Sequence, residues 1–133
     1  MSKAKKNKTP VIAIVVSEFN EVVTHGLVRG ARGFLAEHQI DVDDAHVFSV
    51  PGAFELPLVA EKLGRTGRFD GVIILGCVIK GETAHFEYIS LAATHGTMMA
   101  NLNCGVPIAF GVITTYTAEQ AERLAKGSVL TST

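Results

Sequence analysis

The nine-residue apolar run GVIILGCVI (71–79) constrains the fold of this chain more than any other segment. A strand without polar alternation is typically buried on both faces, as the strands of parallel sheets are. The run PVIAIVVS (10–17) has the same character. Strands of this kind need helices on both faces of one sheet, so the sequence predicts an α/β protein.

The segments around these runs complete an alternation of strands and helices. Asn20 is the expected N-cap of a first amphipathic helix. Pro57 suits the first turn of a second helix, where its missing N–H group costs nothing. A strand is expected near 46–50, helices near 57–63, 85–102 and 117–127, and a fourth strand near 106–114. This order predicts a parallel sheet covered by helices on both faces. The expected buried stripe of the first helix consists of Val22, Val23, Leu27, Val28, Ala31, Phe34 and Leu35.

The size and composition of the chain indicate one domain that associates with copies of itself. Its 133 residues suit a single domain over 1–133, and 47% of them are hydrophobic while 19% are charged. A domain this small buries only about two-thirds of its chain surface. Surplus apolar surface is therefore expected to be covered by another copy.

Several kinds of partner are not expected. The net charge of −1 gives no reason to expect nucleic acid. The lysine-rich residues 1–9 are interpreted as a flexible basic arm, with an anionic partner or packing on a neighbour as the alternatives. The five histidines are scattered singly, so no metal is expected, and no apolar run approaches membrane-spanning length. Cys77 and Cys104 have no CxxC spacing, which favours reduced thiols and a cytoplasmic location.

Four segments that follow the strands are expected to meet at one edge of the sheet, where ligands of such folds bind. These segments are SEFN (17–20), VPGAFE (50–55), KGETAH (80–85) and TTYT (114–117). In the first, Phe19 either packs against the helix start or offers a flat face for a planar ring. In the second, Glu55 either favours a helix N-terminus or accepts ligand hydrogen bonds.

The third segment places Gly81 in a tight turn and His85 in the first turn of a helix. Backbone N–H groups in such a turn can hold an anion. The positive end of the helix dipole favours a neutral imidazole, which can accept and return protons. A half-buried structural histidine is the alternative that these residues leave open. In the same part of the sheet and helix, Met98 and Met99 are expected to pack, and Cys77 to be buried and unreactive.

Four motifs in order, SEFN, VPGAFELP, LGCVIKGETAHFEYIS and VPIAFGVITT, resemble the 6,7-dimethyl-8-ribityllumazine synthase family over 10–120. The resemblance implies a flavodoxin-like three-layer sandwich with a four-stranded parallel sheet flanked by helices. It also implies that the protein catalyses the penultimate step of riboflavin biosynthesis and needs no organic cofactor or metal for it. In that step 5-amino-6-(D-ribitylamino)uracil and 3,4-dihydroxy-2-butanone 4-phosphate give 6,7-dimethyl-8-ribityllumazine, phosphate and water.

The resemblance also implies roles for individual residues. His85 would shuttle protons, Phe19 would stack on the pyrimidine, and Phe110 would come from an adjacent subunit. The residues implied to contact the pyrimidine and its ribityl chain are Ala53, Phe54, Glu55, Val78, Ile79 and Lys80. Those implied to receive the phosphate are Gly81, Glu82 and Thr83.

For assembly, the resemblance implies a pentamer with active sites between subunits, and a decamer or a sixty-subunit icosahedral shell as larger forms. Riboflavin synthase is an implied partner. The family carries a phosphate-contacting arginine after the EQA motif, and then a final helix. Here Arg123 comes one residue early, Lys126 is the other nearby cation, and GSVLTST (127–133) has no helical pattern, so that helix is expected to be shortened or absent.

Two interpretations of this C-terminal segment stay open. Either Arg123 or Lys126 reaches the phosphate from a shifted helix, or the chain is a catalytically weak or inactive member of the family. Such a member would bind pyrimidines or flavins, or form a shell scaffold. A different hypothesis for the function of the whole chain is a flavodoxin-like electron carrier. Such a protein needs a loop rich in Ser, Thr and Gly after the first strand, and the segment SEFNE is not such a loop.

Overall fold

The computed structural model describes residues 9–81 and 83–126, so the lysine-rich run up to Lys8, Glu82 and GSVLTST lie outside the described residues. The described chain contains a four-stranded sheet in the order β2-β1-β3-β4. All three pairings are parallel, as the sequence predicts. The strands are β1 (Ile12–Ser17), β2 (Val47–Val50), β3 (Gly71–Ile79) and β4 (Ile108–Thr115).

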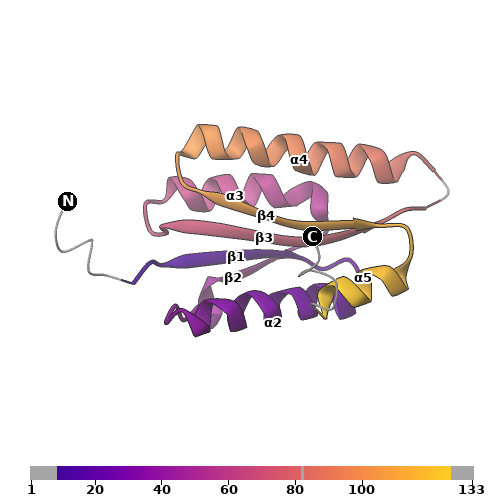
Figure 1. The fold of residues 1–133 in the computed structure, drawn as a ribbon. Helices are drawn as coiled ribbons and strands as arrows, with labels where there is room; N and C mark the ends of the chain where they lie inside the picture. Colours follow the sequence, from indigo (N-terminus) through magenta and orange to yellow (C-terminus); the bar gives the residue numbers. More distant parts are fainter. Residues whose placement is uncertain (1–8, 82, 127–133) are drawn as a thin grey trace.

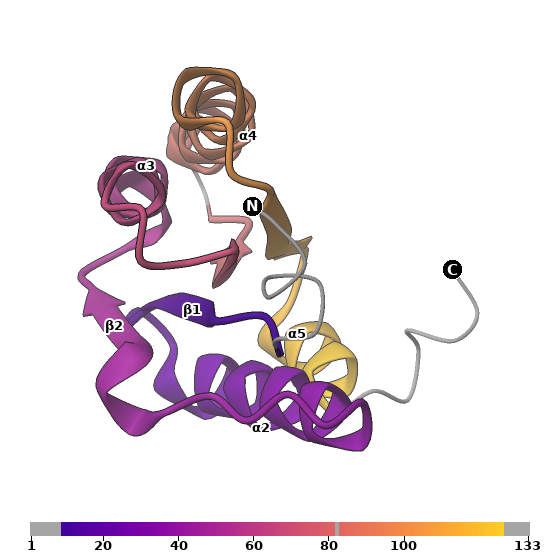
Figure 2. The same cartoon turned by 90° about the vertical axis from the view of Figure 1, so that its left-hand side faces the viewer.

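Helices cover both faces of this sheet (Figure 1). Seen along the strands, α3 and α4 lie together on one face, and α2 and α5 lie on the other (Figure 2). The predicted three-layer flavodoxin-like sandwich is confirmed. Two short 3-10 helices, η1 (Asp44–His46) and η2 (Ala53–Glu55), are additions that the sequence did not predict. The α-helices are α2 (Glu21–Glu37), α3 (Leu56–Arg65), α4 (His85–Cys104) and α5 (Ala118–Ala125).

The two apolar runs form the centre of the sheet because they are buried on both faces. Every residue of β1 after Ile12 is buried. Within β3, Ile74 is fully buried and lies between Val15 of β1 and Phe110 of β4. Side chains of β1 and β3 alternate between the core beneath α3 and α4 and the core beneath α2 and α5. The helices therefore close both sides of the sheet and leave its carboxyl edge open.

Close packing between β3 and β4 requires a residue without a side chain at Gly111. A Cβ atom at this position would lie 2.9 Å from the carbonyl oxygen of Ile74 and 2.7 Å from Cδ2 of Leu75. We expect Gly111→Ala to lower the free energy of unfolding by about 1–3 kcal/mol, since the backbone must shift. Urea denaturation measures this change.

The matched control is Gly30→Ala on α2, where a Cβ atom would meet nothing within 4 Å. This substitution should leave stability unchanged or raise it by up to about 1 kcal/mol. A Gly111→Ala protein as stable as the unsubstituted chain would show that the β3–β4 contact adapts without strain.

The helix α2 differs from the expectation in two respects: in its N-cap and in two of its apolar residues. Asn20 is at the N-cap as predicted, but its side chain makes no capping hydrogen bond, and its backbone is left-handed, with φ 66°. Asparagine tolerates this conformation better than most residues. Val22 is 73% exposed and Phe34 is 62% exposed, so their assignment to the buried stripe is wrong. Each neighbours a true inward position, Val23 or Leu35, and one residue on a helix is about 100° of rotation.

The outer face of α4 is apolar and uncovered in the described chain. Met98 is 65% exposed and Met99 is 45% exposed, so the expectation that they pack is wrong within one chain. The reason is that α4 is apolar on both sides, and only the side with Ala93 and Ala100 meets α3 and the sheet. Exposed residues on the outer side recur at alternating steps of three and four, which is the spacing of a helix–helix contact. We call this set the α4 seam: Tyr88, Leu91, His95, Met98 and Leu102.

Candidate active site

A groove of about 770 Å³ lies beyond the carboxyl ends of the strands, where the sequence places the ligand site. Three of the four expected segments reach it, and they come from the ends of β1, β2 and β3. The fourth segment, TTYT, is not part of the lining. The lining residues are Phe19, Pro51, Gly52, Ala53, Phe54, Glu55, Cys77, Val78, Ile79, Gly81, Thr83, His85, Phe86, Tyr88 and Ile89.

Two exposed aromatic rings line the groove from different loops. Phe19 is 60% exposed and Phe54 is 58% exposed. The N–H group of Glu18 donates to the carbonyl oxygen of Val50 at 2.8 Å, which fixes the end of β1 beside the end of β2. Both rings therefore project from anchored backbone, and their exposed faces suit a planar ligand.

The carboxylate of Glu55 is held in position by the turn that precedes α3. The N–H group of Gly52 donates to Oε1 of Glu55 at 2.9 Å. This bond fits the structural role considered for Glu55. The carboxylate can still accept hydrogen bonds from a ligand, because its two oxygens together accept about four hydrogen bonds. Glu55 is thus a fixed acceptor on the groove wall.

His85 is the first residue of α4 and its side chain is exposed in the groove. Its backbone N–H group donates to Oγ1 of Thr83 at 3.2 Å. Gly81 lies on the same rim, and a Cβ atom there would meet nothing within 4 Å, so a ligand can approach its backbone. The expected Glu82 lies outside the described residues. Together this rim offers an imidazole, a hydroxyl and the N-terminus of a 20-residue helix.

Three of the expected site residues do not line this groove. Phe110 lies in the middle of β4, opposite Ile74, and is 44% exposed. Arg123 is on α5, across the sheet from α4. Lys80 follows β3 directly, and its ammonium group lies 5.5 Å from the centre of the Tyr116 ring.

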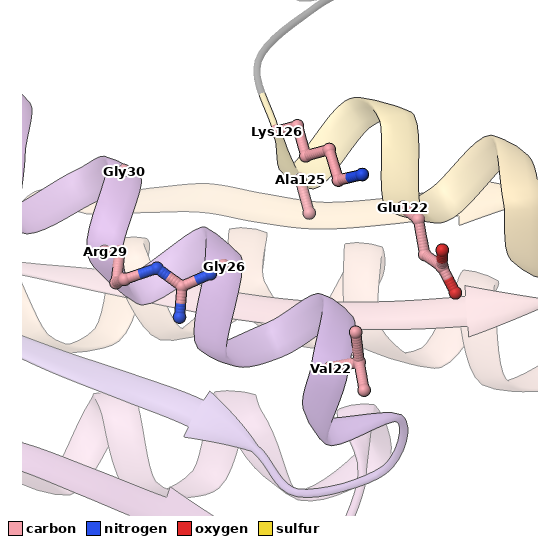
Figure 3. Close-up of a pocket in the computed structure, with 7 residues that line it drawn as sticks. All are labelled: Val22, Gly26, Arg29, Gly30, Glu122, Ala125 and Lys126. Atoms are coloured by element: carbon pink, nitrogen blue, oxygen red, sulfur yellow. The ribbon is translucent and has the colours of Figure 1, made fainter.

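A second groove, of about 490 Å³, lies between α2 and α5 (Figure 3). Lys126 lines it together with Arg29 and Glu122. Lys126, the alternative phosphate cation, is therefore on the other side of the sheet from His85.

Sequence reasoning missed several residues of the main groove. Phe86 and Ile89 line it, and both also pack against the core beneath α4. Ile89 lies four residues after His85 and three after Phe86, so helical periodicity could have placed Ile89 beside both of them. Pro51, Gly52 and Tyr88 also line it and were not assigned roles.

Cys77 is 2% exposed, and burial raises the pKa of its thiol from 9.0 to about 11. The thiolate is the reactive form, so we expect the native protein to react slowly with iodoacetamide at Cys77 at pH 8.

The raised pKa of Cys77 also makes the stability of the fold depend on pH. As the pH rises, the thiol of the unfolded chain ionises before that of the folded chain, so the free energy of unfolding should fall between pH 9 and 11, by about 1.4 kcal/mol per pH unit. Urea denaturation at several pH values measures this slope. A Cys77→Ala protein with the same slope would contradict it.

Within residues 9–81 and 83–126, no group of three or more His, Cys, Asp or Glu side chains could hold a metal ion. In the same described part of the chain, no helix has the length and apolar character needed to span a bilayer.

The fold and the groove place the chain among flavodoxin-like α/β proteins with a small-molecule site at the carboxyl edge of the sheet. Comparison with known proteins identifies the family. Residues 10–131 match the family model described as 6,7-dimethyl-8-ribityllumazine synthase. The chain belongs to this family, and it is a transferase of riboflavin biosynthesis.

Relatives with that name are similar over most of the chain. 6,7-Dimethyl-8-ribityllumazine synthase 1 of Caulobacter vibrioides is 58% identical over 84% of this chain and 73% of its own length. The synthase of Chloroherpeton thalassium is 47% identical over 86% of this chain and 74% of its own. That of Salinibacter ruber is 49% identical over 82% and 70%.

Proposed function

We propose that the protein catalyses a condensation in this groove. It joins 5-amino-6-(D-ribitylamino)uracil to 3,4-dihydroxy-2-butanone 4-phosphate to give 6,7-dimethyl-8-ribityllumazine, with release of phosphate and water. The main support is that Phe19, Glu55 and His85, from three separate loops, line one groove. A ring-stacking face, a fixed acceptor and a proton carrier are the groups that this condensation needs.

In this proposal the pyrimidine lies on the Phe19 side of the groove. Its ring stacks on Phe19, and its ribityl chain meets the turn that contains Ala53, Phe54 and Glu55. Because Glu55 is held by Gly52, it can bind ligand N–H or hydroxyl groups without first becoming ordered. The edge of the ring borders the end of β3, at Val78, Ile79 and Lys80.

The phosphate of the second substrate occupies the rim where α4 begins. Gly81 and Thr83 line the groove there, and Glu82 completes the proposed binding segment. The open backbone at Gly81 and the partial positive charge of the α4 N-terminus favour an anion at this place. Arg123 is not assigned a contact within the groove of its own chain.

The chemistry requires proton transfers more than a protein nucleophile. The primary amine of the pyrimidine attacks the ketone, and Schiff-base formation, phosphate elimination and ring closure each move protons. His85 lies beside the phosphate rim and can accept and return them. Holding the two reactants together in one groove contributes several kcal/mol of the barrier reduction.

We also propose that the protein works as a homo-oligomer, a pentamer in its basic form. The α4 seam supports this, because its apolar side chains are exposed in one chain and have the spacing of a helix–helix contact. Tyr88 belongs both to the seam and to the groove lining. A neighbour packed on the seam would therefore border the groove, which is consistent with Phe110 of one subunit closing the groove of the next.

Larger assemblies and the cellular setting complete the proposal. Pentamers could pair into a decamer or form a sixty-subunit shell, and riboflavin synthase, which consumes the product, is the proposed partner. A cytoplasmic location is supported by the two cysteines, Cys77 and Cys104, which are both free thiols.

The test is to mix the purified protein with both substrates and follow lumazine absorbance and fluorescence together with phosphate release. Product formed above the uncatalysed background is the expected result. A folded, assembled protein that yields no product would contradict the proposal and favour a binding or scaffold role.

A further inference from the structure

We propose that the left-handed backbone at Asn20 holds the Phe19 ring at the wall of the groove, which makes Asn20 a positioning residue for the pyrimidine. Asn20 acts through its backbone conformation, and its side-chain amide is not required to touch the substrate. This inference rests on the proposed function, because Phe19 is the ring on which the pyrimidine is proposed to stack.

The connection that carries Phe19 is short, and its first end is fixed to the sheet. β1 ends at Ser17, which is 1% exposed, and three residues later the chain is in α2. The N–H group of Glu18 donates to the carbonyl oxygen of Val50 at 2.8 Å, which extends the pairing of β1 with β2 by one residue. Phe19 therefore follows directly on anchored backbone.

The second end of the connection is fixed to the first turn of α2. The carbonyl oxygen of Asn20 accepts hydrogen bonds from the N–H groups of Val23 at 3.0 Å and Thr24 at 3.1 Å. The side chain of Val23 is fully buried and Thr24 is 1% exposed, so this turn is packed against the core. Phe19 thus lies between two anchored positions, and the dihedral angles of the connection decide where its side chain projects.

The conformation of Asn20 is what closes this connection. The chain reverses direction here, because α2 runs back along the sheet from the end of β1 (Figure 1). Asn20 has φ 66° and ψ 63°, a region that asparagine and glycine adopt far more readily than other residues. Asparagine is usually favoured at an N-cap because its side chain accepts a backbone hydrogen bond, but Asn20 makes no such bond. The left-handed backbone is therefore the structural reason for asparagine at this position.

Phe19 depends on its backbone for its direction because little else holds it. Its side chain is 60% exposed, so packing against other side chains contributes little to its position. It nevertheless lines the groove together with Phe54 and Glu55. A ring that is already directed into the groove binds a planar ligand without a further cost of ordering. A change of conformation at Asn20 would remove this advantage without removing the ring.

The test compares Asn20→Val with Asn20→Gly in equilibrium binding of the pyrimidine. A β-branched residue does not tolerate the left-handed region, so the connection should rearrange in Asn20→Val. We expect its Kd for the pyrimidine to rise about tenfold, approaching that of Phe19→Ala, which loses the stacking face. Asn20→Gly lacks the amide but adopts the same φ, and its Kd should stay within about threefold. Equal losses in Asn20→Gly and Asn20→Val would overturn the inference.

A double-mutant cycle shows whether Asn20 acts through Phe19. In the Phe19→Ala protein, Asn20→Val should change the Kd for the pyrimidine by less than about twofold, because no ring is left to position. In the Phe19 protein, Asn20→Val should raise the KM for the pyrimidine and leave that for the butanone phosphate unchanged. A full tenfold effect of Asn20→Val in the Phe19→Ala background would contradict the proposed role.

Gln39→Val is the matched control for the strain itself. Among the described residues, Asn20 and Gln39 are the two non-glycine residues with positive φ, and Gln39 has φ 62°. Gln39 follows the C-terminal end of α2 and is not among the residues that line the groove. Its substitution should lower stability in urea about as much as Asn20→Val and leave the Kd for the pyrimidine unchanged. Equal weakening of pyrimidine binding by Gln39→Val would assign the effect to general destabilisation.

A tryptophan at the position of Phe19 gives a readout that needs neither substrate nor turnover. The chain contains no tryptophan, so Phe19→Trp introduces a single fluorophore. Adding Asn20→Val to this variant should lower the fluorescence anisotropy of the tryptophan, and adding Gln39→Val should leave it unchanged. If the unsubstituted protein makes no lumazine, the proposed function fails, and the anisotropy still tests Asn20. The same anisotropy in all three proteins would overturn the inference.

Discussion

Replacing His85 with alanine is expected to lower kcat by about 10²- to 10⁴-fold, while the dissociation constant of the pyrimidine changes little. The physical reason is that the imidazole is proposed to move protons in several steps without holding the ring. His85 is exposed at the first position of α4, and its N–H group is bonded to Oγ1 of Thr83, which the substitution retains. The fold should therefore persist. Steady-state kinetics and equilibrium binding of the pyrimidine measure the two quantities.

His25→Ala serves as the control, because His25 is exposed on α2, which covers the other face of the sheet from α4, and it is not among the residues that line the groove. It should leave kcat unchanged. Equal losses of kcat and pyrimidine affinity in His85→Ala would instead indicate that His85 shapes the groove. An unchanged kcat would remove His85 from the proton steps altogether.

Replacing Leu91 with glutamate is expected to dissociate the oligomer and to abolish most of the turnover. Leu91 is 67% exposed within one chain, so the monomer should fold normally. In the assembled protein this position would lie in the α4 seam, where an unpaired carboxylate in each copy costs several kcal/mol. Turnover should fall with assembly because Phe110 is proposed to come from the adjacent subunit. Sedimentation velocity and the lumazine assay follow the two effects, and circular dichroism reports the fold.

Val22→Glu is the matched control for this substitution. Val22 is also an exposed apolar residue, but it lies on α2, on the opposite face of the sheet from α4. Its substitution should not dissociate the α4 contact. A Leu91→Glu protein that sediments like the unsubstituted chain would show that the α4 seam is not the subunit interface.

The sheet could be predicted from sequence because its central strands have an unambiguous composition. The runs 10–17 and 71–79 are continuously apolar, and only a strand covered on both faces accommodates such a run at this length. The helices followed from spacing and from Pro57. Which apolar residues of α2 are buried was harder to predict. Val22 and Phe34 are as apolar as their neighbours Val23 and Leu35, and only the side of the helix on which they lie, which tertiary packing decides, leaves them exposed.

The groove could be anticipated in part. The rule that ligands bind at the carboxyl ends of parallel strands predicts that the loops of Phe19, Glu55 and His85 lie together. The bond between Gly52 and Glu55, and the contact of Lys80 with Tyr116, depend on turn geometry and on strand register, which composition does not encode. The exposure of Met98 and Met99 also could not be predicted, because composition does not show which side of an apolar helix meets the rest of the chain.

One helix links the proposed chemistry to the proposed assembly. His85 begins α4, and the exposed apolar side chains continue along the same rigid rod, with Tyr88 common to the groove and the seam. If the groove is complete only when a neighbouring subunit packs on the α4 seam, dilution that dissociates the proposed oligomer would also stop turnover. The amount of protein made by the cell would then set the activity of each molecule, as well as the number of molecules, without an inhibitor or a modifying enzyme.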